Sequence, residues 1–305
     1  MDKQRILQIT GLAMVLLLLG MLVLMIFFSV QSTQLKVEPL PHAGTTYTQT
    51  MHRLINTELS SFSGWVPNDI SPPSIFLDNK PNFQLGVLET LRYSSRVLRD
   101  NLSRQRTTDN INIHVKEAFE LLSNDATRWV LPSAENRYHE AAKQLQEYQN
   151  ALANEDPKAS FFPRSDNLIQ LLEQYSSLLG STTNRLLQAS SDMQAIDLDK
   201  GQKQQVHVPW YEIDDRYYMA KGVGYSLHAM YQSLYIEFID VLKDKHAEAL
   251  FLSIIESLKY AYFEPTFITN GDSDGLLANH NNNIRVFLDD ARQKNNSLIA
   301  MLDQG

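Results

Sequence analysis

The chain has 305 residues, 43% of them apolar, with 27 lysines and arginines against 35 aspartates and glutamates and no cysteine. This apolar content is enough for a packed core and excludes a disordered chain. The net charge of −8 argues against nucleic acid as a partner. The absence of cysteine excludes disulfide scaffolds, thiol nucleophiles and zinc sites built on thiolates, and it suits an exported domain.

The N-terminus contains an uncharged run from Ile9 to Val30. As a helix this run would be about 33 Å long, which matches a hydrocarbon core of about 30 Å. Lys3 and Arg5 precede it, and the positive flank of a span stays in the cytoplasm. The alternative is a cleaved signal peptide, whose apolar core is about 7–15 residues long and ends at small residues. We predict a cytoplasmic tip and transmembrane anchor over residues 1–30, with the rest of the chain outside the cell membrane.

Beyond a tether over residues 31–45, apolar side chains recur with helical periodicity in stretches that lack internal proline. A proline-rich loop over 60–81 and a polar linker over 191–208 interrupt the pattern, and residues 111–115 alternate in a way that could start a strand. We predict an all-α fold, with an N-terminal single transmembrane helix followed by a multi-helix antiparallel bundle over 46–305 that has a possible sub-division near 191–208. The helices are predicted over residues 46–59, 82–104, 109–123, 133–152, 165–190, 214–242, 247–263 and 281–303, and Gly222 and Gly224 are expected to allow close helix approach.

Arg92, Arg96 and Arg99 follow one another at i, i+4 and i+7, so they share one face of a predicted helix. Guanidinium groups match phosphates, lipid head groups and anionic glycans, so this stripe is a candidate binding site. The alternative is a solvated face paired with acidic neighbours, for which Glu89 and Asp100 are placed one helical turn away.

The loop from Gly64 to Gly86 is long for a compact domain, and long ordered loops are often functional. Its candidate ligand-binding residues are Trp65, Asp69, Asp78 and Asn82. They form a ligand site if they converge on a groove beside the arginine stripe, and a structural cap if they pack inward. The tryptophans at 65, 129 and 210 all lie near prolines, and we favour apolar plugs at the bundle ends over glycan-stacking platforms.

The segment from Asn270 to Gly275 resembles the start of a calcium loop, with oxygen-bearing side chains at positions one, three and five and glycine at six. Position twelve is Asn281 instead of the bidentate glutamate, so a tight turn is the preferred interpretation, and His280 is expected to open the last helix. We predict no catalytic residues, no metal site and no cofactor.

Several motifs occur in order along the chain. They are Gly64-Trp65-Val66-Pro67-Asn68-Asp69, Leu77-Asp78-Asn79, Pro81-Asn82-Phe83-Gln84-Leu85-Gly86-Val87-Leu88, Arg92, Arg99-Asp100, Ser103-Arg104, Trp129-Val130-Leu131-Pro132-Ser133, Arg164-Ser165-Asp166-Asn167-Leu168, Pro209-Trp210-Tyr211-Glu212-Ile213-Asp214-Asp215 and Leu277-Ala278-Asn279-His280. Together they resemble the bacterial family catalogued as domain of unknown function 2333, over roughly residues 40–303 and the leading anchor. The resemblance implies an inner-membrane protein of Gram-negative bacteria with its C-terminal domain in the periplasm, and it implies no activity.

Three functions fit these patterns. We expect a non-enzymatic scaffold or adaptor of the cell envelope, which is anchored in the membrane and binds other envelope proteins. The first alternative is a binding module for an anionic lipid or glycan, centred on the arginine stripe. The second is a hydrolase with an unrecognised site, built from carboxylates such as Asp69, Asp78 and Asp100, or Glu212 and Asp214.

Overall fold

The computed structural model describes residues 3–27, 34–69, 79–106, 109–191, 193–198, 202–209, 211–263 and 278–304, together with residues 265, 268, 269 and 271. These residues form an all-α fold with one small β-hairpin, so the predicted all-α class is confirmed. The helices are α1 (Lys3–Phe27), α2 (Thr45–Leu59), α3 (Asn79–Val97), α4 (Ile113–Leu122), α5 (Ala134–Ala153), α6 (Ser165–Ser190), α7 (Tyr211–Glu237), α8 (Ile239–Asp244), α9 (Glu248–Lys259) and α10 (His280–Gln304). A 3₁₀ turn, η1 (Val66–Asn68), precedes α3, a π-helical turn, η3 (Leu98–Leu102), continues it, and the strands are β1 (Met193–Leu198) and β2 (Gln202–His207).

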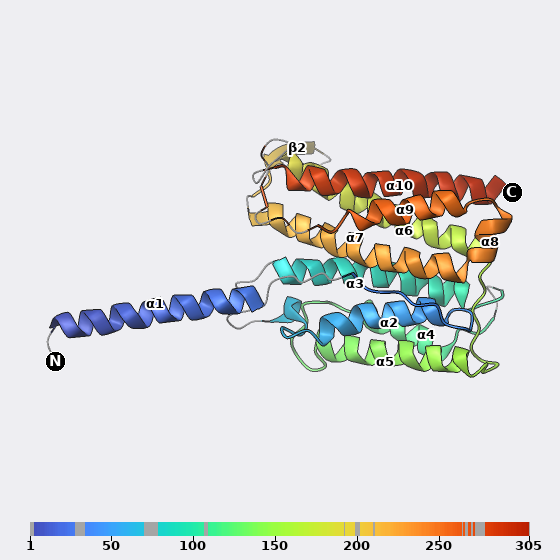
Figure 1. Ribbon diagram of the computed structural model, residues 1–305, viewed down its shortest axis with the longest axis horizontal. Coiled ribbons are helices and arrows are strands. Elements are labelled where there is room, and N and C mark those ends of the chain that lie inside the picture. The colour runs from blue at the N-terminus through green and yellow to red at the C-terminus, as the bar shows by residue number, and fades with distance from the viewer. Residues whose placement is uncertain are drawn as a thin grey trace.

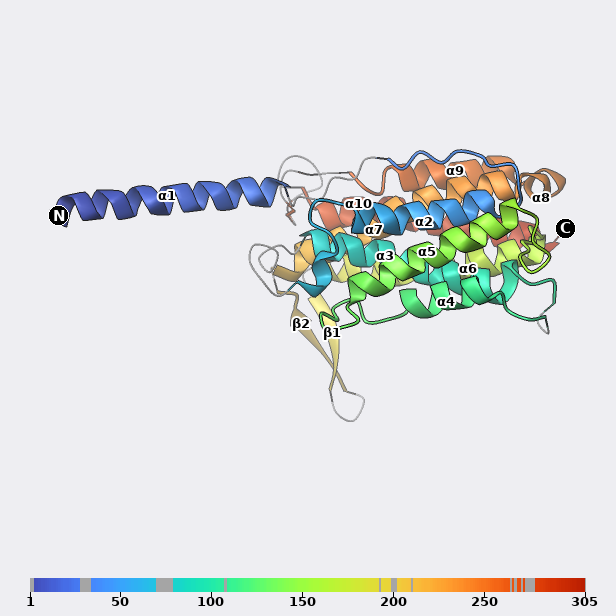
Figure 2. The same cartoon turned by 90° about the horizontal axis from the view of Figure 1, so that it is seen from below.

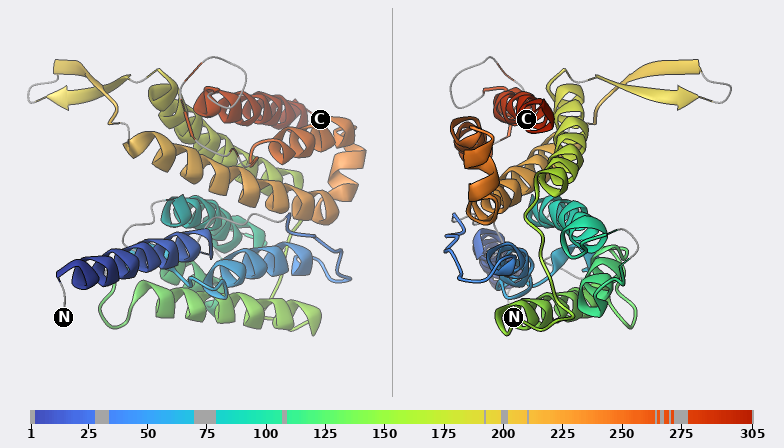
Figure 3. Two further views of the ribbon diagram at one scale, coloured as in Figure 1. Left: turned by 60° about the vertical axis from the view of Figure 1, so that its left-hand side comes forward. Right: turned by 90° about the vertical axis from the view of Figure 1, so that its right-hand side faces the viewer.

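The helices of the bundle lie in two layers, which are clearest in Figures 1 and 3. Helices α2, α3, α4 and α5 form one layer, and α6, α7, α9 and α10 form the other. The short helix α8 joins α7 to α9 at the end of the bundle where the C-terminus lies (Figure 1). The layers meet mainly where α3 crosses α7, with further contacts from α2 to α7 and from α3 to α6.

The crossing of α3 and α7 depends on two glycines that face each other. A Cβ atom on Gly86 would lie 2.9 Å from Val223 N and would overlap Met219 O, and one on Gly222 would lie 3.0 Å from Phe83 C and would overlap Phe83 O. One turn further along, Ser226 Oγ donates to Thr90 Oγ1 at 2.7 Å. Gly224 makes a similar close approach to the Ala261 backbone, so the predicted role of Gly222 and Gly224 is confirmed.

The N-terminus of α2 is capped by a carboxylate from α7. Glu237 Oε2 accepts from Gly44 N at 2.7 Å, and Oε1 accepts from Thr46 N at 2.8 Å and Tyr47 N at 3.1 Å. These N–H groups have no partner within the helix, so an anion here stabilises the helix end. Gly44 has a left-handed φ of 81°, and a Cβ atom there would overlap the ring of Phe161.

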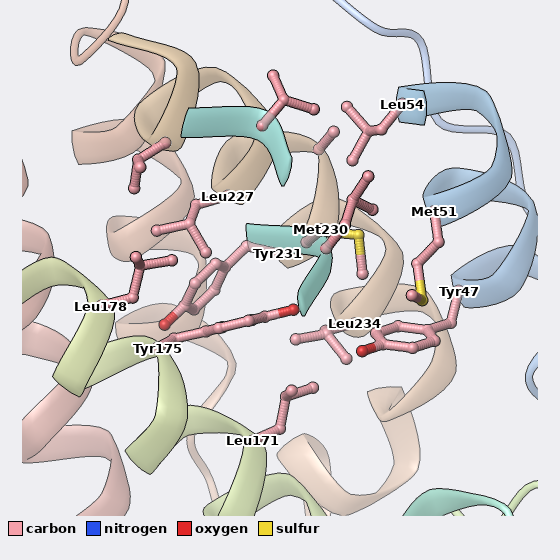
Figure 4. Close-up of a cluster of buried hydrophobic side chains, with 14 of the residues drawn as sticks. Tyr47, Met51, Leu54, Leu171, Tyr175, Leu178, Leu227, Met230, Tyr231 and Leu234 are labelled. Carbon is pink, nitrogen blue, oxygen red and sulfur yellow. The ribbon is translucent and has the colours of Figure 1, made fainter. Parts of the chain in front are cut away.

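The buried core is continuous between the layers (Figure 4). Tyr47, Met51 and Leu54 from α2 face side chains from α6 and α7, which include Leu171, Tyr175, Leu178, Leu227, Met230, Tyr231 and Leu234. Each such side chain contributes about 1.5–3 kcal/mol through burial. The tyrosine hydroxyls are satisfied inside the core, since Tyr47 Oη donates to Ser94 O at 3.1 Å and Tyr175 Oη lies 2.7 Å from Ser94 Oγ.

An extended strap over residues 34–40 precedes α2 and runs along the surface of α7 and α9 (Figure 2). Leu35 is buried, and Lys36 O accepts from Arg53 Nη1 at 2.6 Å. At the end of the strap, Leu40 N donates to Thr46 Oγ1 at 3.0 Å. The strap therefore leads the chain to the end of the bundle away from α1, where α2 begins.

Most helix predictions agree with the structure, and the differences lie at helix ends. Asn112 caps α4 by accepting from His114 N and Val115 N, so residues 113–115 start a helix and not the strand that their alternation allowed. The predicted helix over 214–242 is interrupted at Phe238, and His246, with a φ of 53°, lies beyond the end of α8. Helix α10 begins at His280 as expected, with Asn282 N donating to Asn279 Oδ1 at 2.9 Å.

The segment over 191–208 was predicted to be a polar linker, and most of it forms the β1–β2 hairpin instead. The strands pair antiparallel from Met193 opposite His207 to Leu198 opposite Gln202. The hairpin projects sideways from the bundle in Figures 2 and 3. Its polar composition concealed it, because the sequence of β2 has one apolar residue, Val206, and lacks the alternation by which half-buried strands are recognised.

Helix α1 extends away from the bundle in Figures 1 and 2. Among the residues that the structure describes, no helix is long and apolar enough to cross a membrane, so the transmembrane part of the predicted fold is not supported.

We predict that Gly222→Ala destabilises the protein by about 3 kcal/mol, because the added methyl group meets the α3 backbone, which cannot move as a side chain can. Gly180→Ala in α6 is the matched control, since its Cβ atom would meet only the Arg292 side chain. The control should change stability by about 1 kcal/mol or less. Urea unfolding followed by circular dichroism measures both, and equal effects would contradict the proposed packing constraint.

We also predict a pH-dependent effect of Glu237→Gln. Burial raises the pKa of Glu237 above its ordinary value despite its hydrogen bonds to Gly44, Tyr47 and Thr46. Protonation of this group therefore favours the folded state, and that contribution is lost as the pH rises through the raised pKa. The wild-type protein should gain unfolding free energy relative to Glu237→Gln as the pH falls from 7 towards 4.5. A difference that stays constant over this range would contradict the assignment.

Candidate functional site

The connection between α2 and α3 holds the first predicted site residue, Trp65. Its side chain is 2% exposed, its Nε1 donates to Ala126 O at 2.9 Å, and its ring contacts Tyr138 at a centroid distance of 4.8 Å. Gln84 fastens the same segment, because its Oε1 accepts from Val66 N at 2.9 Å and its Nε2 donates to Gly64 O at 2.8 Å. Trp65 therefore closes the end of the core and offers no face to a ligand.

Asp69 and Asn82, the other described residues of the predicted loop site, do not lie together. Asp69 is exposed, and Asp78 lies outside the described residues. Asn82 Nδ2 donates to Asp215 Oδ1 at 2.6 Å, which links α3 to α7 on another side of the bundle. The described residues of the loop do not converge on one groove.

All the hydrogen bonds shown for the Arg92 side chain are to other residues of the bundle. Its Nε donates to Leu122 O at 2.9 Å and its Nη2 to Asn124 O at 2.6 Å, where α4 ends. Its Nη1 donates to Glu89 Oε1 at 2.6 Å. The guanidinium group thus satisfies carbonyl groups that the end of a helix leaves without partners, which is a structural use of its charge.

The other two arginines of the stripe have separate environments. Arg99 makes a two-point ion pair with Asp100, at 2.7 and 2.8 Å, and stacks over the Phe119 ring at 3.9 Å. This pairing with Asp100 raises the pKa of Arg99. Arg96 is exposed and lies 5.7 Å from the ring centroid of Tyr93. Arg92 and Arg99 therefore match the paired-face alternative, and Arg96 is the member of the stripe most open to solvent.

Three charged residues that the sequence did not single out are buried together where α2, α3 and α7 meet. Lys80 Nζ and Glu58 Oε2 form an ion pair at 2.5 Å, with side chains 7% and 4% exposed. Lys221 is 0% exposed, and its Nζ lies 5.6 Å from the ring centroid of Tyr218 and 5.9 Å from that of Phe83. Buried ions of this kind are costly unless paired, so they mark either an important structural contact or a site.

Burial lowers the pKa of Lys221 to about 8, and the nearby positive charge of Lys80 adds to the effect. An amine with this pKa is partly neutral near pH 8 and has the basicity of a proton acceptor. Its complete burial means that the lowered pKa follows from packing and gives a substrate no access. The sequence does indicate that Lys221 is unusual, because it is the one Lys, Arg, Asp or Glu between Arg216 and Glu237.

A small polar cavity of about 300 Å³ lies beside Asn82, between α3, α6 and α7. Arg216 lines it and is held in place, with Nη2 3.0 Å from Glu212 Oε2 and Nη1 donating to Gln188 Oε1 at 3.2 Å. Two of the carboxylates named for a hydrolase are engaged by arginines, with Glu212 bound to Arg216 and Asp100 to Arg99.

Metal binding receives no positive indication from the described part of the chain. No group of three or more histidine and acidic side chains is arranged there to hold an ion. Most of the Asn270–Gly275 turn lies outside the described residues, which include Gly271 alone from it.

These features define a two-layered, all-α bundle whose buried charges hold its helices together. The chain belongs to a family of uncharacterised proteins conserved in bacteria, DUF2333, whose family model matches residues 1–305. The resemblance seen in the sequence is therefore confirmed. No curated protein and no solved structure matches the chain.

We predict that Arg92→Ala lowers the unfolding free energy by about 2 kcal/mol, because two carbonyl groups at the end of α4 lose a charged donor. Arg96→Ala is the control from the same helix face and should change it by about 0.5 kcal/mol or less, since the side chain is exposed. Chemical denaturation of the two variants measures the difference. A larger effect at Arg96 would contradict this division of roles.

Proposed function

We propose that the protein is a non-enzymatic scaffold or adaptor of the bacterial cell envelope, attached to the inner membrane by its N-terminal segment, with the bundle in the periplasm. Membership of a bacterial family is consistent with such a role and specifies no activity. Two features that project from the bundle support the proposal, namely helix α1 and the β1–β2 hairpin.

The argument for membrane attachment rests on the sequence and on what α1 leaves exposed. The uncharged run from Ile9 continues to Val30, beyond the last described residue of α1. Leu12, Leu16 and Leu17 are each more than 60% exposed although they are apolar. Apolar side chains exposed on every face of a helix are unfavourable in water and favourable in lipid. Lys3 and Arg5 place the N-terminus on the cytoplasmic side under the positive-inside rule.

The observation that carries the adaptor role is the hairpin. It is a two-stranded sheet within the described residues, so each strand has one side without a described neighbouring strand. An unpaired strand edge can hydrogen-bond to an extended segment of another protein. A hairpin that projects from a stable bundle presents such an edge at a distance from the core (Figure 3).

The alternative, in which the arginine stripe binds an anionic lipid or glycan, has weaker support. Arg92 and Arg99 already hold partners within the bundle, so an anion would have to displace Glu89 or Asp100. Arg96 alone offers an exposed guanidinium group, and one exposed charge contributes little affinity.

We predict that a photo-crosslinking amino acid at Lys203, in β2, captures one discrete envelope protein in living cells. The same amino acid at Lys143, on the exposed face of α5, is the control and should capture none. Denaturing gel electrophoresis of membrane fractions reads out the result. Equal labelling at both positions, or no crosslinked species at Lys203, would contradict the assignment of the hairpin as the partner-binding element.

A further inference from the structure

The loop between α4 and α5 carries an exposed apolar tip. Trp129 is 60% exposed, Val130 48% and Leu131 85%, and these three residues are consecutive. The expectation that Trp129 acts as an apolar plug at the end of the bundle is therefore wrong, whereas it is correct for Trp65. Single exposed apolar residues are ordinary, but a run that contains tryptophan marks a contact surface.

Hydrogen bonds hold the base of this loop in place, so the position of its exposed tip is defined. Arg128 O accepts from Ala134 N at 2.8 Å, which closes the loop, and from Asn68 Nδ2 at 3.3 Å. On the near side, Asp125 Oδ1 accepts from Thr127 N at 3.0 Å and Thr127 Oγ1 at 2.9 Å. These contacts orient the tip and leave its three apolar side chains exposed.

The tip lies at the end of the bundle from which α1 leaves. Helix α2 ends there, and the loop base contacts the segment that follows α2 through Asn68 and Trp65. Figures 1 and 2 both place the α4–α5 connection at the end nearest α1. The chain from Phe27 to Gln34 can span at most about 25 Å, so this end of the bundle stays close to the end of α1. Phe62, 77% exposed, lies in the turn after α2 at the same end.

We propose that the Trp129–Leu131 tip inserts into the interfacial region of the lipid bilayer in which α1 is anchored, and so fixes how the bundle sits on the membrane. This inference rests on the proposed membrane attachment and deepens it by naming a second lipid contact. Tryptophan is favoured at the boundary between head groups and acyl chains, where its ring is buried and its N–H stays hydrated. Val130 and Leu131 add apolar area at the same depth.

The charges around the tip are compatible with a membrane surface. Arg128, which precedes the tip, is half-buried and can reach lipid phosphates. The nearest carboxylate before the tip, Asp125, turns back to Thr127, and the hydrogen bonds from Thr127 lower its pKa. On the far side, Ser133 caps α5 by accepting from Asn136 N. Asp125 therefore stays ionised at the base of the loop, whereas the tip itself, residues 129–131, carries no charged side chain.

The test uses the absence of native cysteine, because a single introduced cysteine takes a fluorescent label at that position alone. Three variants of the full chain, Leu131→Cys, Leu19→Cys and Leu252→Cys, carry an NBD fluorophore in vesicles of phosphatidylethanolamine and phosphatidylglycerol. Leu19 lies in α1. Leu252 is the matched control, an apolar residue, 45% exposed, in α9, which begins beside α8 at the end of the bundle away from α1. Nitroxide-labelled lipids with the quencher at a shallow or a deep position are then added.

We expect several-fold quenching of the label at residue 131 by the shallow nitroxide, quenching at residue 19 by the deep nitroxide, and little at residue 252 by either. Quenching at 131 no greater than at 252, with residue 19 still quenched, would overturn the inference and leave the membrane anchor intact. If peptidoglycan fragments, and not the vesicles, shield the label at residue 131, the tip binds a glycan and the inference is wrong. Absence of quenching at both 19 and 131 would overturn both the anchor and the tip. Leu131→Cys should fold normally, because the side chain makes so little contact.

Discussion

The close approach of α3 and α7 at Gly86 and Gly222 is the constraint on which the rest of the fold depends. It brings the two backbones together where no side chain can intervene, and so sets the separation of the two layers. The hydrogen bonds from Asn82 to Asp215 and from Ser226 to Thr90 require that separation, since both join α3 to α7. The buried position of Lys221, one residue before Gly222, follows from the same crossing.

Charged side chains then hold together elements that are distant in sequence. Glu237 caps α2, Arg92 satisfies the end of α4, and Lys80 pairs with Glu58 across α2 and α3. Each pairing joins a charge to a backbone group or to an opposite charge, so these charges are used within the bundle. An acidic domain can therefore carry several arginines without forming an anion-binding face. Among the described parts of the chain, α1 and the hairpin project from the bundle in Figure 2, and the α4–α5 loop exposes apolar side chains.

The sequence predicted helices well wherever an apolar stripe and a capping residue agreed, as in α5, which begins after Ser133, and α10, which begins at His280. It did not predict the hairpin, because β2 offers a single valine among polar residues and no apolar alternation. The candidate site was predicted poorly for a different reason. Periodicity places Arg92, Arg96 and Arg99 on one face. Arg92 is held by Leu122 O and Asn124 O, which reach it only through the tertiary fold, whereas Arg99 pairs with Asp100, the next residue in the chain. Similarly, proximity to proline could not distinguish the buried Trp65 from the exposed Trp129.

The strap over residues 34–40 has a mechanical consequence. Because the strap lies between α1 and the start of α2, tension applied through α1 reaches the strap before it reaches α2. The resisting contacts are the burial of Leu35, the bond from Arg53 to Lys36 O and the bond from Leu40 N to Thr46. A force that broke these contacts one after another would lengthen the connection to α1 while the crossing of α3 and α7 stayed intact. The strap would thus take up a pull on α1 before the contacts between the two layers do.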